Sequence, residues 1–386
     1  MNQFQQIGAA IEINLGSLGQ RIGASLVVVI GIAGVVGVLV TVLAMGQSLH
    51  RTMATTGRAD RAIILAKGAQ SEGSSSIPRD SAVTLAEVGR RGVEGKPIAS
   101  MEMLTQTRLM ARDGQIKNVS VRGVGPLAGS LRPEVRIVQG RMFRPGLQEL
   151  VVGRNLGIKF RNLEPGDRIQ LQGGTWTIVG TFASGGSAHD SDILGDSDSL
   201  LAAFHRNAFQ SVTIALDGPD GLARLNALIA ANPALVVEAQ REDVFFAAQS
   251  GVLTRVLTVI GLFVGVTMAI GAVFSALNTM YAAVSAQSVE IATLRAIGYN
   301  GMAVLVGVFC EALALALAGA LAGIAVAWLL FNNHALSTGS VVYALHIDFP
   351  LAMLGIIWAL AIGTLGGIFP ALRAARMPVA EALRAT

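Results

Sequence analysis

The sequence predicts an α-helical membrane protein with four transmembrane helices and a large mixed α+β domain inserted between spans 1 and 2. Three observations lead to this fold class. The chain is 52% hydrophobic and only 14% charged, which is unusual for a soluble globular protein. Four apolar runs are each long enough to cross about 30 Å of hydrocarbon. By contrast, 23 of the 29 Lys and Arg residues and 20 of the 25 Asp and Glu residues fall between Gln47 and Ser250.

Hydropathy and charge together divide the chain into nine consecutive segments. The predicted order is an N-terminal cytoplasmic or interfacial helix (1–21), a first span (22–46), a periplasmic α+β domain with two lobes (47–250), a stalk and second span (251–283), a coupling helix (284–301), a third span (302–331), a short periplasmic loop (332–349), a fourth span (350–372) and a cytoplasmic tail (373–386). A disordered tail is the alternative for the first segment. Ala44-Met45-Gly46 looks like a signal-peptidase site, but the apolar run before it is longer than a signal core, which favours an uncleaved span.

The charged segment carries the alternating patterns of a mixed α+β domain. Asp113-Gly114 separates two alternating runs, which predicts a tight hairpin, and Gly173-Gly174 separates a second pair. Further patterns predict strands at 61–67, 210–216 and 235–239 and helices at 78–89, 199–208 and 221–231. A helical pattern at 241–255 continues without a breaker into the apolar run 256–280. We therefore expect a stalk helix that is continuous with the second span.

Basic residues near the ends of the apolar runs set the expected orientation in the membrane. With four spans, the following residues fall on one side: Arg21, Arg295, Arg373, Arg376 and Arg384. The short loop 332–349 on the opposite side contains no Lys or Arg. Both termini and the segment 284–301 are therefore expected in the cytoplasm, with the large domain outside.

The segment 284–301, VSAQSVEIATLRAIGYNG, is too polar for lipid and lies between two apolar runs. Its apolar residues recur at a spacing that predicts one helical face: Ile291, Leu294 and Ile297. Glu290 and Arg295 lie off that face, and Gly298 follows at the position where a left-handed helix cap is common. A short amphipathic helix of this kind suits a surface that a soluble partner grips. An ordinary turn with a helical tendency is the alternative.

Three stretches resemble ABC-transporter permeases of the MacB/LolC/FtsX type. "SVEIATLRAIGYN", followed by an apolar helix that carries Glu311, is similar to the region after the second span in that family. "EPGDRIQLQGGTWTIVGTFASGGSAHDSDI" is similar to its periplasmic domain, and "PALRAARMPVAEALRA" is similar to its C-terminal signature. The three matches occur in the order of the family. This sequence differs in having Ala292-Thr293 where the family often has Gly and an aliphatic residue, and in one extra residue within "ARMPVAEAL".

The resemblance implies a non-catalytic permease subunit in a bacterial inner membrane, which couples ATP hydrolysis by a separate cytoplasmic ATPase to a conformational change outside the membrane. The implied partners are a cytoplasmic ABC ATPase dimer, a second copy of the permease or a related permease, and membrane lipids; a periplasmic adaptor protein is left open. The resemblance places these residues at the ATPase contact: Glu290, Ile291, Leu294, Arg295 and Gly298. ATP and Mg would be held by the partner ATPase, and no cofactor is expected in this chain.

Motifs of several other function classes are absent from the sequence. A Walker A loop needs Gly-x4-Gly-Lys-Ser/Thr, whereas Gly95-Lys96 is followed by Pro97. No basic run alternates with aromatic residues, so nucleic-acid binding is not implied. An acidic cluster comprises His189, Asp190, Asp192, Asp196 and Asp198. Because it lacks the later Glu of a calcium loop and the chain has no Gly-x-Ser-x-Gly elbow, we interpret it as a solvated, hydrogen-bonded loop and not as a metal or hydrolase site.

Pairs of small residues within the spans indicate close helix packing. These pairs are Gly261/Gly265, Gly319/Gly323 and Gly363/Gly367, and they predict a packed bundle and a dimer. Glu311 is the acid within a span. A helix-bonding role is favoured over a proton relay, because the other spans offer no ionisable partner. The single cysteine, Cys310, excludes an intramolecular disulfide.

Two other functions are alternatives to transport. One is an FtsX-like mechanotransmission regulator of periplasmic enzymes, although a domain of roughly 200 residues is large for that group. The other is a membrane-anchored enzyme or receptor that works without an ATPase. The sequence does not identify a substrate, so lipoprotein, peptide, lipid and small amphiphile all stay open.

Overall fold

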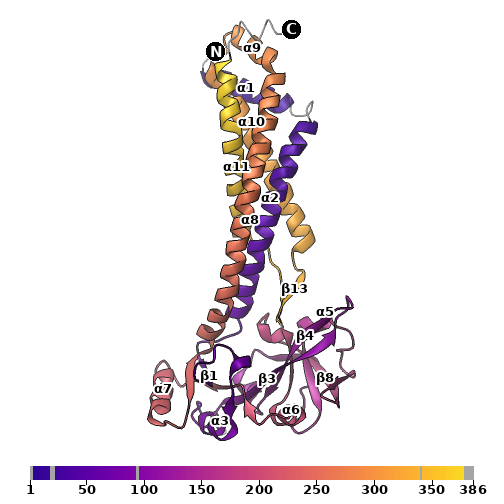
Figure 1. The fold of residues 1–386 in the computed structure, drawn as a ribbon, viewed down its shortest axis with the longest axis vertical. Coiled ribbons are helices and arrows are strands. Elements are labelled where there is room, and N and C mark those ends of the chain that lie inside the picture. The colour runs from indigo at the N-terminus through magenta and orange to yellow at the C-terminus, as the bar shows by residue number, and fades with distance from the viewer. Residues whose placement is uncertain (1–2, 18–21, 93–94, 340, 378–386) are drawn as a thin grey trace. The chain divides into compact units, whose positions relative to one another are not determined.

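The computed structural model of the chain describes residues 3–17, 22–92, 95–339 and 341–377, which form two compact units (Figure 1). The helical unit lies within Met1–Gly46, Arg255–His334 and Leu345–Thr386. The α/β domain comprises Gln47–Thr254 and Ala335–Ala344. Ala335–Ala344 therefore belong to the domain that Gln47–Thr254 build, although a part of the helical unit separates the two stretches in the sequence.

Six helices among the described residues make up the helical unit: α1 (Gln3–Ser17), α2 (Ile22–Ala54), α8 (Glu242–Ala286), α9 (Ser288–Ala296), α10 (Gly301–Phe331) and α11 (Phe349–Arg376). Two of them, α2 and α8, continue into the residues of the α/β domain. Of the six, α2, α8, α10 and α11 are long and apolar enough to cross a membrane, as the sequence predicts. The predicted stalk is the first part of α8. Most of the predicted C-terminal tail, from residue 378 onward, lies outside the described residues.

Glycines allow the long helices to approach one another closely. All six predicted packing glycines face another helix of the same chain: Gly261 and Gly265 of α8 face α2, Gly319 and Gly323 of α10 face α2, and Gly363 and Gly367 of α11 face α10. A Cβ atom on Gly367 would lie 2.5 Å from the Cβ of Ala312, too close for any side chain. The glycine pairs therefore serve packing within one chain, and they offer no separate evidence for a dimer.

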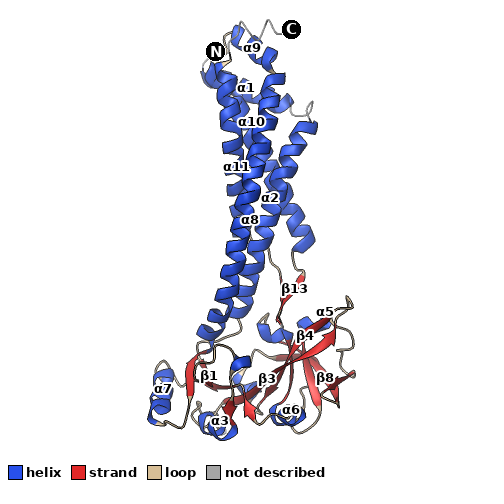
Figure 2. Cartoon of the chain, in the orientation of Figure 1, coloured by secondary structure: helices blue, strands red, loops and turns tan. Residues whose placement is uncertain are grey.

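The α/β domain is built on one ten-stranded sheet, whose strands are drawn in red in Figure 2. Its strands are β1 (Arg61–Ala66), β3 (Ala99–Met110), β4 (Ile116–Val124), β5 (Arg136–Gly140), β6 (Glu149–Gly153), β7 (Arg168–Leu171), β8 (Gly174–Ala183), β9 (Asp192–Asp196), β11 (Ser211–Ala215) and β12 (Val237–Arg241). Their order is β12-β1-β11-β3-β4-β9-β6-β8-β5, with β7 also paired to β8. The long strand β3 joins the two groups of strands on either side of it.

Short helices and strands complete the domain: η2 (Glu72–Ser74), β2 (Ile77–Pro78), α3 (Arg79–Ala86), α4 (Ala128–Leu131), α5 (Arg154–Lys159), η3 (Ala188–Ser191), α6 (Ser197–Ala203), β10 (Ala208–Phe209) and α7 (Gly221–Ala231). Both predicted hairpins are present, as β3–β4 and β7–β8. Gly114 supplies the positive φ of 78° that the first turn requires. The core includes Trp176, Ile64 and Phe209, which are fully buried.

The acidic cluster is not the solvated loop that we predicted. His189, Asp190, Asp192 and Asp196 are all buried, because each carboxylate has a partner inside the domain. Asp190 accepts hydrogen bonds from the Gly186 N–H at 2.8 Å and from the Ser184 hydroxyl at 2.9 Å. Asp196 caps α6 by accepting from a backbone N–H at 3.0 Å. Asp198 alone is exposed.

The predicted loop 332–349 contains a β-hairpin that the sequence analysis missed. Its strands are β13 (Ala335–Thr338) and β14 (Val341–Ala344), which pair antiparallel. The hairpin belongs to the α/β domain, and Val342 and Tyr343 are buried there. The hairpin residues Ala335–Ala344 between α10 and α11 are therefore a structural part of the domain.

Candidate functional site

Helix α9 occupies the middle of the predicted coupling segment and has one buried side. Ile291 is buried within the helical unit, Leu294 is half-buried and Glu290 is exposed. Ile297 is 71% exposed, because α9 ends one residue before it. The three apolar residues therefore do not share one face as predicted. The exposed apolar side chains in and directly after α9 are Val289 and Ile297, whereas Ile291 is buried.

The end of α9 is closed by the left-handed cap that the sequence predicts. Gly298 has a φ of 101°. Its N–H donates to the carbonyl of Arg295 at 3.1 Å, and the N–H of Tyr299 donates to the carbonyl of Leu294 at 3.1 Å. This pair of bonds is the Schellman arrangement, in which glycine is favoured because it has no Cβ.

Two other elements hold the segment around α9. Gln6 of α1 accepts a hydrogen bond from the Asn300 N–H at 3.2 Å and donates to the Gly298 carbonyl at 3.4 Å. Arg295 donates from Nη1 to the carbonyl of Met377, the residue after α11, at 2.6 Å. Arg295 is thus engaged within the chain, so its first role is to position α9. The five predicted contact residues divide by exposure, with Glu290 and Gly298 exposed, Leu294 and Arg295 half-buried, and Ile291 buried.

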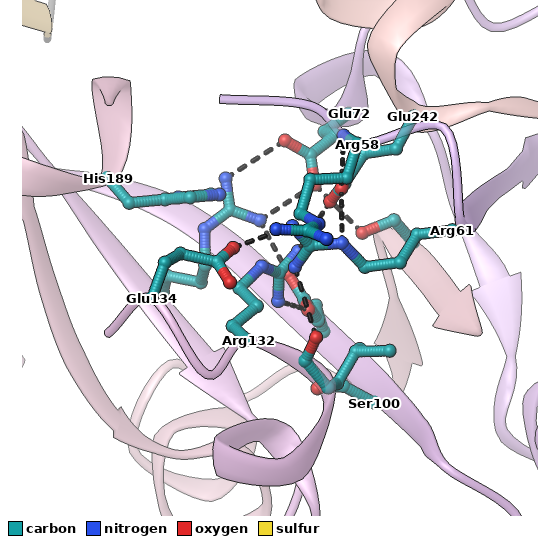
Figure 3. A network of polar contacts seen from close by, with 12 residues as sticks. Arg58, Arg61, Glu72, Ser100, Arg132, Glu134, His189 and Glu242 are labelled. Carbon is teal, nitrogen blue, oxygen red and sulfur yellow. Dashed lines mark hydrogen bonds and ion pairs between the residues drawn. The ribbon is translucent and has the colours of Figure 1, made fainter. Parts of the chain in front are cut away.

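The α/β domain contains a second arrangement, a set of buried arginine and carboxylate side chains that the sequence analysis did not identify (Figure 3). We define this arginine–carboxylate network by its members: Arg61, Glu72, Glu102, Arg122, Arg132, Glu134, Asp192 and Glu242. Except for Glu134, each side chain is at most 9% exposed. The members come from β1, η2, β3, β4, β9, the start of α8 and the residues after α4.

Arg122 of β4 gathers three carboxylates. Its Nη1 lies 2.8 Å from Oε1 of Glu72 and 2.7 Å from Oε2 of Glu102. Its Nε lies 3.1 Å from Oδ2 of Asp192. The Ser211 hydroxyl also donates to Glu72 at 2.8 Å. A single guanidinium therefore ties η2, β3 and β9 to β4.

Glu242, the first residue of α8, is bound by two arginines. Nη2 of Arg132 lies 3.1 Å from Oε1 of Glu242, and Nη1 of the same arginine pairs with Glu102. Nε of Arg61 lies 2.9 Å from Oε2 of Glu242. The backbone N–H of Arg58 also donates to Glu242 at 3.2 Å. The N-terminus of α8 is in this way anchored to the sheet by charged contacts in a buried environment.

Electrostatics favour the charged forms of Glu102, Asp192 and Arg122 at the centre of the network. Burial alone would raise the pKa of Glu102, but Arg132 and Arg122 outweigh burial and lower the pKa to about 2. Burial likewise opposes the charge of Asp192, yet Arg122 and His189 hold the pKa of Asp192 below its usual value. Burial would lower the pKa of Arg122, but Glu72 and Asp192 raise that pKa well above its ordinary range. Glu102, Asp192 and Arg122 are therefore paired in the interior and charged at neutral pH.

One signal in the sequence could have revealed this network. Arg122 stands in β4, where six consecutive residues are buried, and Glu102 stands in β3 next to the buried Met103. A charged residue within a buried strand must be paired, because an isolated buried charge is very costly. The pairing itself could not be predicted, since Arg61 and Glu242 are far apart in the sequence.

The β13–β14 hairpin is seated next to this network, on η3. The Ser191 hydroxyl donates to the Val342 carbonyl at 2.8 Å and accepts from the Val342 N–H at 2.9 Å. Asn155 of α5 donates to the same carbonyl at 3.0 Å. Ser191 directly precedes Asp192, which pairs with Arg122. The hairpin and the network therefore share one short segment, η3 and the start of β9.

His189 completes the surroundings of the network. Its Nδ1 lies 3.0 Å from Oδ2 of Asp192, and its ring packs edge-on against Phe246 of α8, with 6.0 Å between ring centroids.

No group of three or more potential ligands for a metal ion occurs in the described parts of the chain. Glu311 of α10 is buried in the helical unit and has interactions there.

Two family models match this chain and together cover most of it. Residues 24–232 match the MacB-like periplasmic core domain, and residues 257–379 match the FtsX-like permease C-terminal domain. The first match alone spans more than half of the chain. The chain therefore belongs to the MacB/FtsX-like family of ABC transporter permeases.

Solved structures show weaker likenesses. The extracellular domain of the noncanonic ABC-type transporter YknZ from Gram-positive bacteria is 12% identical, with a TM-score of 0.36 over 47% of this chain and 100% of that chain. The periplasmic region of MacB from Actinobacillus actinomycetemcomitans is 12% identical, with a TM-score of 0.37 over 49% of this chain and 92% of that chain. No curated protein sequence matches significantly. The family assignment accordingly rests on the two family models.

Proposed function

We propose that this chain is the transmembrane subunit of a MacB/LolC-like ABC transporter. A separate cytoplasmic ATPase hydrolyses ATP, and the permease converts that event into a conformational change of the α/β domain in the periplasm, which exports or extracts a substrate. The observation that carries the proposal is helix α8. It begins at Glu242 in the arginine–carboxylate network and ends at Ala286, directly before α9.

The coupling step depends on how α9 and α8 are held. α9 is fixed at its C-terminal end by Gln6 and Arg295, so a partner that moves α9 also acts on α1 and the end of α11. At the other end of α8, Glu242 is bound by Arg61 and Arg132. A displacement of α8 therefore acts on the sheet through ion pairs and not only through flexible loops.

The β13–β14 hairpin offers a second connection to the domain. It lies between α10 and α11 in the chain, and its Val342 backbone is bound by Ser191. Movements of α10 and α11 would reach η3 through this hairpin, whereas movements of α8 reach the network through Glu242. Because η3 leads into Asp192 of the network, the two connections converge on Arg122.

The proposed arrangement in the cell follows the basic residues at the helix ends. Arg295, Arg373 and Arg376 would face the cytoplasm of a bacterium, and the α/β domain would lie outside the inner membrane. ATP and Mg would be bound by an ATPase dimer, and a second permease copy or a related permease would complete the complex. Glu311 would act in helix bonding, since the substrate is handled outside the membrane.

Ile297, the exposed residue directly after α9, provides the test. We expect Ile297→Asp to reduce co-purification of a co-expressed candidate ABC ATPase about tenfold, because a desolvated apolar contact at an interface centre is worth at least 1–2 kcal/mol. Val138→Asp is the control, since Val138 is a similarly exposed apolar residue, at 61%, in the α/β domain. Equal recovery of the ATPase with both variants would remove the docking assignment.

A second candidate function is FtsX-like regulation of periplasmic enzymes. It is favoured by the match of residues 257–379 to the FtsX-like permease domain. Affinity capture of the full chain from membranes distinguishes the two. Recovery of a cell-wall hydrolase without a periplasmic adaptor would favour regulation, and a substrate released in an ATP-dependent manner would favour transport.

A further inference from the structure

A cleft of about 550 Å³ opens in the α/β domain where the turn after α3, the end of β11 and the start of α7 meet. Its volume falls in the range of small-molecule sites, roughly 300–1,000 Å³. None of its lining residues belongs to the arginine–carboxylate network or to the seat of the β13–β14 hairpin. The cleft is therefore a feature that the proposed coupling does not use.

Arginine side chains dominate the charge of this cleft. Three of its lining residues are arginines, Arg90, Arg91 and Arg224, and Asp217 is the acid among the described lining residues. Arg91 donates to the Gly95 carbonyl at 2.8 Å. Arg224 donates to the backbone carbonyl of Asp217 and lies 3.3 Å from its carboxylate. The side chain of Arg224 is 60% exposed, so further donor groups of its guanidinium can reach a ligand.

The backbone fixes Arg90 and the start of α7 in place around the cleft. The N–H of Arg90 donates to the Ala215 carbonyl at 2.9 Å, and its carbonyl accepts from the Ile98 N–H at 2.8 Å. Gly221, the first residue of the eleven-residue α7, lines the cleft. The N-cap residue Asp220 makes no side-chain capping bond. The positive end of the α7 dipole therefore adds to the charge of the arginines.

Leucine side chains also line the cleft. Leu225 is 1% exposed and Leu216 is 8% exposed, and both belong to the hydrophobic core of the domain. Leu228, at 38% exposure, leaves an apolar surface open beside Arg224. The cleft thus combines the guanidinium groups of its arginines with the apolar side chain of Leu228. This combination matches a ligand that has one charged end and one apolar end.

We propose that this cleft binds a small organic carboxylate with an apolar body. The guanidinium groups of Arg90 and Arg224 hold the carboxylate, for which the planar fork of arginine is well suited. The apolar body lies on Leu228, the open apolar side chain of the cleft. This site is independent of the coupling proposal, because neither its residues nor its chemistry involves the ATPase.

Benzoate is a suitable probe, because it is soluble and carries one carboxylate on an apolar ring. We expect isothermal titration of the full chain in nanodiscs to detect benzoate, whereas acetate, which lacks the ring, and benzylammonium, which reverses the charge, bind at least tenfold more weakly. Arg224→Gln should weaken benzoate binding about tenfold. Arg168→Gln, which removes an exposed arginine of β7, should leave binding unchanged.

Two measurements keep the outcome decisive. The thermal unfolding of Arg224→Gln should equal that of the unmodified chain, because this side chain is largely exposed; Leu228→Asp provides a second variant that should abolish benzoate binding through its charge. If inorganic phosphate and acetate bind as well as benzoate, the cleft is only a general anion site. If benzoate does not bind, or both arginine variants weaken it equally, the proposal fails.

Discussion

Nε of Arg61 lies 2.9 Å from Oε2 of Glu242, and the two side chains are 1% and 0% exposed. The pair joins the first residue of β1, the strand that follows α2, to the first residue of α8. α2 and α8 are the helices that run from the helical unit into the α/β domain. The buried ion pair thereby links the strand that follows α2 to the first residue of α8. Loss of either charge would remove one of the two ion pairs of the other residue, because Arg61 also pairs with Glu134 and Glu242 also pairs with Arg132.

Glu242→Gln tests the importance of this pair. Removing one partner of a buried ion pair costs about 3–5 kcal/mol of unfolding free energy, so we expect a clear loss of stability of the α/β domain in chemical denaturation. Glu238→Gln is the matched control, because Glu238 is an exposed residue of neighbouring β12. If the two variants unfold alike, the network does not anchor α8.

Acid should destabilise the domain through Glu102. Its pKa is about 2 in the folded protein and ordinarily 4.5, so its contribution is present above pH 4.5 and is lost as pH falls from 4.5 to 2. That difference corresponds to about 3 kcal/mol of unfolding free energy. The lowered pKa of Asp192 acts in the same direction. Denaturant midpoints measured between pH 7 and pH 2 should fall mainly below pH 4.5.

Glu102→Gln supplies the control for the acid dependence. This variant should be less stable at pH 7, because Arg132 and Arg122 lose a charged partner. Its stability should also change less between pH 4.5 and pH 2, because the titrating group is gone. An unchanged slope in this interval would mean that other carboxylates cause the acid effect.

The hairpin seat can be tested at Ser191. Ser191→Ala removes both hydrogen bonds to Val342 and leaves its buried N–H without this acceptor, at a cost of about 1–3 kcal/mol, while the Val342 carbonyl keeps its bond from Asn155. We expect faster amide hydrogen exchange in β13 and β14 while the exchange in β3 and β4 stays unchanged. Ser130→Ala, at an exposed position of α4, should alter neither. Uniform exchange across all four strands after Ser191→Ala would contradict a local seat.

Packing of the helical unit can be tested at two glycines. Gly367→Leu would force apart α10 and α11, because a Cβ at this position already meets Ala312 at 2.5 Å, and overpacking of this kind costs roughly 1–3 kcal/mol or more. Gly271→Leu is the control on α8, where a Cβ has open space. Thermal unfolding in detergent should fall only for the first variant. Equal melting of both would mean that α10 and α11 do not depend on this close contact.

Much of the fold could be predicted from local patterns. Asp113-Gly114 and Gly173-Gly174 located two hairpins, because such turns are specified by adjacent residues. The four long helices followed from apolar runs whose length matches a membrane. The β13–β14 hairpin was missed, since its stability depends on Ser191 and Asn155, which lie more than 140 positions earlier in the sequence.

The candidate site was predicted only in part. The Gly298 cap was correct because it depends on neighbouring residues, but the face of α9 was wrong because the helix ends before Ile297. Asp190 and Asp192 were expected in solvent, since acidic residues are usually exposed. Their burial depends on partners such as Arg122, which no local pattern indicates.

The position of Arg122 limits where the α/β domain can be divided when a chimera is made with the α/β domain of a related protein. Its three acidic partners, Glu72, Glu102 and Asp192, come from three elements that span 121 positions of the chain. A chimera with a crossover between Glu72 and Asp192 would combine an arginine from one parent with acids from another. Grafts of substrate-handling loops onto this scaffold should therefore exchange the whole block from η2 to β9 at once.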